Sequence, residues 1–242
     1  MLFSPAKFSV AQACSQLSRN FFNKNITSGY KAAGAGIRLK HTLPEFHVEF
    51  SAFAPVWSEE IVKNHYTGNH ALYVKNLNDT ETKLQDAISS GKTVEAGNLH
   101  RNLRFNSGGH VNHSRLWKFI TPVCNGGGKV IDGSLKKQIE SIWGTVENMM
   151  LALNNTTATI QGSGWGWLAV NKQTLNLELI TTPNQDTPEY YGYLHLFGID
   201  AWEHAFYLDY KTAKAAYFKN IWQIANWKQI QKNYDIAMAT KA

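Results

Sequence analysis

The chain lacks three features that would place it in common protein classes. Its first 44 positions contain no acidic residue, and it has only two cysteines, Cys14 and Cys124. Cys124 is alone outside that acid-free stretch, which excludes an internal disulfide framework there. No apolar run reaches the roughly 18 residues that a membrane-spanning helix requires. We therefore expect a soluble protein that has no membrane partner.

The positive charge of the chain belongs to its beginning. The formal net charge is +6, but six of the 24 basic residues fall before position 45: Lys7, Arg19, Lys24, Lys31, Arg38 and Lys40. The rest of the chain has 18 basic and 18 acidic residues and is neutral overall. A neutral globular part does not favour nucleic acid as a partner.

Residues 1–40 have the composition of a mitochondrial transit peptide, because they are basic, free of acidic residues and contain several serines. We expect cleavage between about Gly29 and Lys40, and a mature protein in the mitochondrial matrix. An unstructured basic tail is the alternative interpretation.

Helical spacing dominates the next hundred residues. Ser58 supplies an N-cap and is followed by two glutamates, which predicts a helix over 58–79. Further helices are expected over 81–90, 94–105, 110–120 and 135–153. In this interpretation Gly108 and Gly109 interrupt the chain, and a glycine-rich loop near 125–132 separates the two halves.

From residue 157 the pattern changes, because glycines and alternating β-branched residues replace the helical period. Strands are predicted over 165–170, 175–181 and 193–199, and a helical segment over 211–227. The chain is thus expected to be an α half followed by an α+β half.

Three groups of polar residues could carry chemistry. His65, Asn69 and Tyr73 form one helical stripe, and His110 and His113 share a helix face. Spacing alone does not decide which of these two histidines would face a site. Each group by itself is more often structural than functional.

The third group is Asp200 and His204, four residues apart after a predicted strand. A carboxylate and an imidazole suit a first-row transition metal of mixed nitrogen and oxygen preference, whereas zinc with cysteine ligands is excluded. Spacing cannot join the three groups into one site.

Four sequence motifs connect these groups: residues 105–113 (FNSGGHVNH), 162–167 (GSGWGW), 184–186 (NQD) and 200–207 (DAWEHAFY). In this order they closely resemble the iron/manganese superoxide dismutase family, over about residues 42–234. The resemblance implies an α+β fold, in which an N-terminal helical hairpin domain (41–126) precedes an α/β domain (127–242) with a three-stranded antiparallel sheet.

The resemblance also implies an activity and a metal site. Superoxide would be converted to dioxygen and hydrogen peroxide at one ion whose four ligands match His65, His113, Asp200 and His204, with a bound solvent as fifth ligand. It thereby selects His113 over His110. Gln185 matches the donor of manganese-type members, while Gly109 stands where iron-type members carry a glutamine. Manganese is therefore expected, with iron as the alternative.

Other matches concern the surroundings of the ion. Tyr73 corresponds to the gateway tyrosine, and an aromatic wall is expected from Trp117, Trp165 and Trp202. Glu203 and Tyr207 match a two-fold interface, which implies a homodimer or homotetramer.

Two positions depart from the family pattern. Asn69, just before His70, replaces a histidine that usually belongs to a proton relay, and Lys214 replaces an arginine near the entrance. A catalytically silent structural protein, for instance of the mitochondrial ribosome, is an alternative that Asn69 and the unusual residues 45–49 favour slightly; such proteins are expected to lose ligands, and this chain has lost none.

Overall fold

The computed structural model describes residues 40–239. Residues 1–39, which hold nearly all of the proposed transit peptide and its cleavage region, lie outside the described residues.

The first long helix is built from three segments that follow one another without a break: α2 (Glu59–Lys63), the π-helical η2 (Asn64–His70) and α3 (Ala71–Ser89). Ser58 caps its start by accepting a hydrogen bond from the Ile61 backbone N–H at 3.2 Å, as the sequence predicts. The break expected near residue 80 is wrong. Buried side chains continue at helical spacing across it: Val74, Leu77, Thr80, Leu84 and Ala87.

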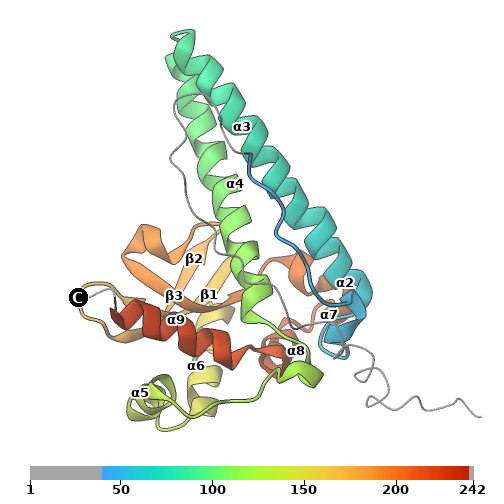
Figure 1. Cartoon of the computed structure of the whole chain (residues 1–242), viewed down its shortest axis with the longest axis vertical. Coiled ribbons are helices and arrows are strands. Elements are labelled where there is room, and N and C mark those ends of the chain that lie inside the picture. Colours follow the sequence, from blue (N-terminus) through green and yellow to red (C-terminus); the bar gives the residue numbers. More distant parts are fainter. Residues whose placement is uncertain (1–39, 240–242) are drawn as a thin grey trace, which may run out of the picture. The chain divides into compact units, whose positions relative to one another are not determined.

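The second long helix, α4 (Thr93–Phe119), packs along α3 to form a helical hairpin (Figure 1). It passes through Gly108 and Gly109, so the interruption predicted there is wrong. Both glycines serve close packing. A Cβ atom on Gly108 would lie 2.0 Å from the Gln185 carbonyl oxygen, and one on Gly109 would lie 2.4 Å from Tyr73 Cδ1.

The predicted helix 135–153 is two helices, α5 (Ser134–Trp143) and α6 (Val146–Ala158). Gly144 has a φ of 81°, in the left-handed region that favours glycine, and so ends the first helix. The Thr145 hydroxyl then accepts a hydrogen bond from the Asn148 backbone N–H at 3.1 Å and caps the second.

The three strands are β1 (Gly164–Asn171), β2 (Leu177–Pro183) and β3 (Tyr193–Asp200), in the antiparallel order β2-β1-β3. The second strand starts two residues later than predicted, because Leu175 adopts a φ of 58° within a turn. The Asn171 side chain stabilises this turn by accepting a hydrogen bond from the Gln173 backbone N–H at 2.9 Å.

The C-terminal helices are α8 (Lys214–Asn220) and α9 (Trp227–Ala239), joined through the short η6 (Ile221–Ile224). The helical prediction over 211–227 is correct for its centre only, and α9 was not predicted. Helix α9 contacts β3, while α6 contacts β1 and β2 (Figure 1). The remaining short elements are η1 (Phe50–Phe53), η3 (Val123–Asn125), η4 (Pro188–Tyr191), η5 (Glu203–Ala205) and α7 (Tyr207–Tyr210).

The main core surrounds β1, whose residues are buried from Gly164 to Val170. Large aromatic side chains fill it, including Trp57, Trp165, Trp167 and Phe197. The expected fold, a helical hairpin followed by an α/β part with a three-stranded antiparallel sheet, is confirmed. Within residues 40–239, no helix is both long and apolar enough to cross a membrane.

Candidate metal centre

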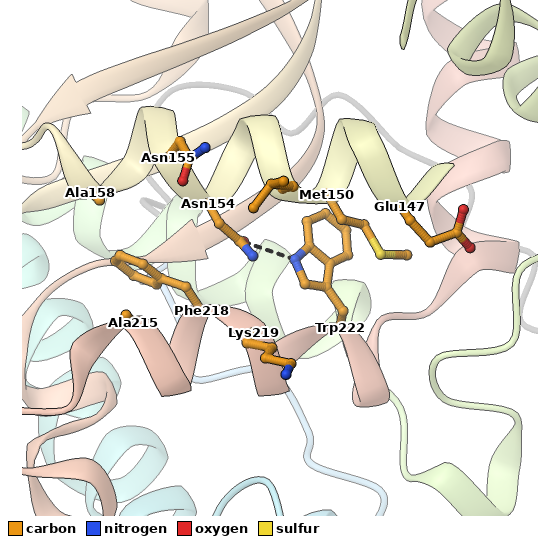
Figure 2. A pocket seen from close by; sticks show the side chains of 10 residues that line it. Glu147, Met150, Asn154, Asn155, Ala158, Ala215, Phe218, Lys219 and Trp222 are labelled. Carbon is orange, nitrogen blue, oxygen red and sulfur yellow. Dashed lines mark hydrogen bonds between the residues drawn. The ribbon is translucent and has the colours of Figure 1, made fainter. Parts of the chain in front are cut away.

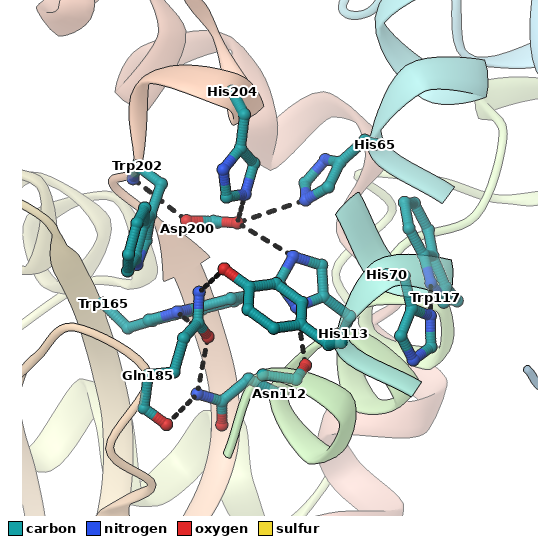
Figure 3. Close-up of polar contacts among 12 residues, drawn as sticks. His65, His70, Asn112, His113, Trp117, Trp165, Gln185, Asp200, Trp202 and His204 are labelled. Carbon is teal, nitrogen blue, oxygen red and sulfur yellow. Dashed lines mark hydrogen bonds and ion pairs between the residues drawn. The ribbon is translucent and has the colours of Figure 1, made fainter. Parts of the chain in front are cut away.

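Four side chains from distant parts of the chain meet at the end of β3: His65, His113, Asp200 and His204 (Figure 3). They come from η2, α4, the last residue of β3 and η5. One potential ligand atom from each lies within 4.8 Å of the others. Asp200 Oδ2 is central, since it lies 3.2, 3.7 and 3.1 Å from Nε2 of His65, His113 and His204.

The strand register places the carboxylate at this point. Asp200 pairs with Trp165 of the central strand, which in turn pairs with Thr182 of β2. Asp200, the last residue of β3, is fully buried. The Asp200 carboxylate is held by the Trp202 backbone N–H, which donates to Oδ1 at 3.0 Å and leaves Oδ2 facing the histidines.

The hydrogen bond of His113 defines which of its ring nitrogens can bind a cation. His113 Nδ1 lies 2.7 Å from the carbonyl oxygen of Gly109. A carbonyl only accepts, so Nδ1 carries the proton and Nε2 presents a lone pair towards Asp200. Such a backbone partner also fixes the orientation of the ring, as is usual for metal-binding histidines.

The arrangement of the imidazoles suits binding of a metal better than hydrogen bonding among the four side chains. His65 Nε2 and His113 Nε2 are buried and have no aligned hydrogen bond among the described residues, although Asp200 is near both. Such orphaned atoms are costly unless something else binds them. Burial lowers the pKa of both histidines and so keeps their lone pairs available. A cation between the four side chains would satisfy these atoms together.

The carboxylate provides negative charge for such a cation. Burial alone would raise the pKa of Asp200, but His204 and His65 outweigh it, and the pKa lies below its ordinary value. Three neutral imidazoles and one carboxylate are a ligand set for a first-row transition metal.

Gln185 lies between the sheet and the hairpin and connects the two. Its Nε2 donates to the Tyr73 hydroxyl at 3.1 Å. Its Oε1 accepts from Trp165 Nε1 at 3.1 Å and from Asn112 Nδ2 at 3.3 Å. These bonds hold the amide group in one orientation (Figure 3).

One face of α4 shapes the cradle for Gln185. Asn112 Nδ2 also donates to the Gln185 carbonyl oxygen at 3.0 Å, and Gly108, four residues earlier, leaves room for that carbonyl. At position 104, the Arg104 guanidinium forms two hydrogen bonds to Asp186, at 2.8 and 2.7 Å. The roles of Arg104 and Asn112 were not predicted from the sequence, although their spacing of four from Gly108 could have indicated a common face.

Tyr73 is buried beside His113, with ring centroids 5.1 Å apart. Burial raises the pKa of its hydroxyl, and the charge of Asp200 raises it further. The hydroxyl therefore keeps its proton at neutral pH.

Aromatic rings surround the histidines. Trp117 lies edge-on to His65 at 5.1 Å, Trp165 to His113 at 5.5 Å, and Trp202 stacks on His204 at 5.5 Å. Trp57, which was not predicted from the sequence to belong to this wall, also contacts His65, at a centroid distance of 5.7 Å. The rings separate the ligand atoms from bulk water and so strengthen electrostatic interactions inside.

The residues expected at an interface or an entrance lie at the edge of the site. Glu203 is exposed, as is Tyr207 with 47% of its surface accessible. The ammonium of Lys214 lies 5.4 Å above the Phe206 ring, and burial lowers the pKa of this lysine. In the described part of the chain, Asn69 makes no side-chain hydrogen bond. The neighbouring His70 accepts a hydrogen bond from the Trp117 indole N–H.

A separate groove, of about 580 Å³, lies between α6 and α8 (Figure 2). Its lining includes Met150, Phe218 and Trp222, and Trp222 Nε1 donates to Asn154 Oδ1 at 2.9 Å. None of its lining residues belongs to the histidine cluster.

Comparisons with known proteins agree with this geometry. The chain matches the alpha-hairpin domain of iron/manganese superoxide dismutases over residues 40–121, and the C-terminal domain of the same enzymes over residues 131–233. The chain therefore belongs to the iron/manganese superoxide dismutase family.

Several curated relatives are named mitochondrial manganese superoxide dismutases. The one from Drosophila melanogaster is 42% identical over 203 residues, which are 84% of this chain and 92% of the relative. That of Schizosaccharomyces pombe is 42% identical over 217 residues, 88% of this chain and 97% of the relative. A Caenorhabditis elegans protein, named mitochondrial manganese superoxide dismutase 2, is 43% identical over 198 residues, 82% of this chain and 88% of the relative.

Proposed function

We propose that this protein is a manganese superoxide dismutase of the mitochondrial matrix, with His65, His113, Asp200 and His204 as ligands of one ion. The observation that carries the proposal is the buried cluster of three imidazoles and one carboxylate, with orphaned nitrogens that face one point. A manganese ion bound there would alternate between its trivalent and divalent states, taking an electron from one superoxide and giving it to a second.

The second half of this reaction consumes two protons, because peroxide leaves as hydrogen peroxide. Tyr73 and Gln185 are the groups of the chain that can hold and pass protons beside the ion, since their hydrogen bond joins the tyrosine hydroxyl to the interior. Burial keeps the hydroxyl protonated, so it can act as a donor. The wall of Trp117, Trp165 and Trp202 excludes bulk water, and Lys214 supplies positive charge for an incoming anion.

The residues around the four proposed ligands favour manganese over iron. The amide of Gln185, which is held by Trp165 and Asn112, matches by resemblance the group with which manganese-type members tune the bound solvent. Gly109 has no side chain that could supply a second amide group, and the curated relatives named above carry manganese in their names.

Purification of the protein from its own source, followed by elemental analysis and a dismutase assay, tests the proposal. We expect about one manganese per subunit and activity proportional to manganese content. Iron in its place, with matched activity, would replace the metal assignment. Protein that binds neither metal and stays inactive after refolding with manganese would overturn the function, and recovery with ribosomes would then favour a structural role.

Association with a second copy through Glu203 and Tyr207 is the further part of this proposal. Both side chains are exposed on consecutive short elements next to His204, whose side chain is 16% accessible in a site that is otherwise closed. A partner covering this edge would complete the enclosure. Light scattering is expected to give a dimer or tetramer, and a Glu203→Lys variant to shift the mass towards the monomer.

The remaining assignments concern processing and domain boundaries. We propose that residues 1–40 are removed on import, and that the mature chain divides into domains over 41–126 and 127–242. The two family matches, which end at residue 121 and begin at residue 131, support this boundary. N-terminal sequencing of the mitochondrial protein tests the cleavage position.

A further inference from the structure

A hydrogen-bonded chain of three side chains leads away from the metal centre on the side opposite Gln185. Trp117 Nε1 lies 3.0 Å from His70 Nδ1, and His70 Nε2 lies 2.9 Å from His110 Nδ1. His70 is fully buried, whereas His110 is half-buried. This series of hydrogen bonds therefore runs from the aromatic wall to the half-buried His110 on α4.

The direction of every hydrogen bond in this chain follows from one fact. An indole N–H only donates, so His70 Nδ1 must accept and carries no proton. An imidazole whose Nδ1 carries no proton is neutral and bears its one ring N–H on Nε2. His70 Nε2–H consequently donates to His110 Nδ1, which must present a lone pair.

The inner end of the chain contacts two of the proposed metal ligands. The His70 ring stacks on His113 with centroids 5.5 Å apart, and Trp117 lies edge-on to His65 at 5.1 Å. The tautomer of His70 thus decides whether the Trp117 indole has an acceptor. With the other tautomer, two N–H groups would face each other and the indole would lose its anchor.

We infer that His110 is a positioning residue for the metal centre. By accepting a hydrogen bond from His70 Nε2–H, it selects the His70 tautomer that binds the Trp117 indole N–H and so holds Trp117 against His65. This role rests on the proposed function of the site. It is distinct from metal binding, because His110 does not belong to the cluster of four ligands.

Other side chains near His110 do not replace its acceptor. Ser114 Oγ lies 3.4 Å from both His70 Nε2 and His110 Nδ1, at the limit of a hydrogen bond. The His41 ring lies edge-on to His110 at 5.7 Å, and its own Nε2 is 3.1 Å from Glu81. Among side-chain atoms, His110 Nδ1 is thus the closest partner of the buried His70 N–H.

Matched variants at position 110 test the inference in the metal-loaded full protein. His110→Leu removes the acceptor, whereas His110→Asn keeps an oxygen close to the position of Nδ1. We expect the leucine variant to lose manganese to a chelator about tenfold faster and to show a shifted midpoint potential, since outer partners typically change metal affinity or activity by 10–100-fold. The asparagine variant should stay close to wild type. His100→Leu, at an exposed position of the same helix, is the control and should change nothing.

A double-mutant cycle separates positioning from a local packing effect. Trp117→Phe keeps an aromatic ring but removes the indole N–H that needs the acceptor. If His110 acts through His70, the two substitutions are coupled, and His110→Leu has little further effect on the potential in the Trp117→Phe protein. If the leucine variant does not fold, His110→Ala takes its place in the same cycle.

The outcomes distinguish this inference from the proposed function. Wild type that lacks a redox metal would overturn both the function and the inference. Wild type that is loaded and active, with additive effects at positions 110 and 117 or with an asparagine variant no better than leucine, would overturn the inference alone.

Discussion

Alanine substitutions at two glycines of the same helix should change stability in opposite directions. Gly97 and Gly108 both lie inside α4, so each replacement gains about 1 kcal/mol of helix propensity. At Gly97 the added methyl group meets no atom within 4 Å. We expect Gly97→Ala to raise the melting temperature by about 2–4 °C, as a gain of 1 kcal/mol does in a domain of this size.

At Gly108 the methyl group would lie 2.0 Å from the carbonyl oxygen of Gln185 and 3.0 Å from its carbonyl carbon. These are backbone atoms, which no change of side-chain rotamer can move away. Overpacking costs about 1–3 kcal/mol, and displacing the Gln185 carbonyl also weakens its hydrogen bond from Asn112, worth about 1 kcal/mol. The net expectation for Gly108→Ala is a loss of about 1–3 kcal/mol.

Thermal unfolding of the manganese-loaded variants, followed by circular dichroism, measures both changes. The Gly108→Ala protein is also expected to lose dismutase activity, because Gln185 moves, while Gly97→Ala keeps it. Equal stabilisation by both substitutions would refute the close approach of α4 and Gln185 that the structure shows.

Three further predictions concern the site and its surroundings. Asp200→Asn should reduce manganese content towards zero by elemental analysis, because it removes the central anionic oxygen, whereas Asp79→Asn at an exposed position of α3 should retain the ion. Gln185→Ala leaves the Trp165 indole without its acceptor and Asn112 with the backbone carbonyl of position 185 alone, so electrochemical titration should find a shifted midpoint potential and activity reduced about 10–100-fold; an unchanged potential would contradict the tuning role. Burial alone would raise the pKa of Glu189, but His195 and Arg115 hold it below its ordinary value of 4.5. A depressed pKa stabilises the fold above the unfolded value and loses that contribution as the pH falls, so melting temperature should drop below about pH 4.5, and drop less in Glu189→Gln; parallel curves would exclude this cause.

The sequence alone predicted the class of fold and, through the family resemblance, the four residues that the structure brings into one cluster. Strands from residue 164 onwards show a period that differs from that of the helices before them, and the cap at Ser58 marks a helix start, because both signals are local. Because the motifs around His113 and Asp200 resemble those of the family, they placed in one site residues that spacing alone could not connect.

The tertiary structure decided what depends on partners far along the chain. Gly108 and Gly109 look like breakers in sequence, and only the approach of Gln185 and Tyr73 shows that they allow a continuous helix to pack closely. The choice of ring nitrogen in His113 likewise depends on the Gly109 carbonyl, and that of His70 on Trp117. Tautomers and close contacts follow from geometry between elements, which no local pattern of residue types contains.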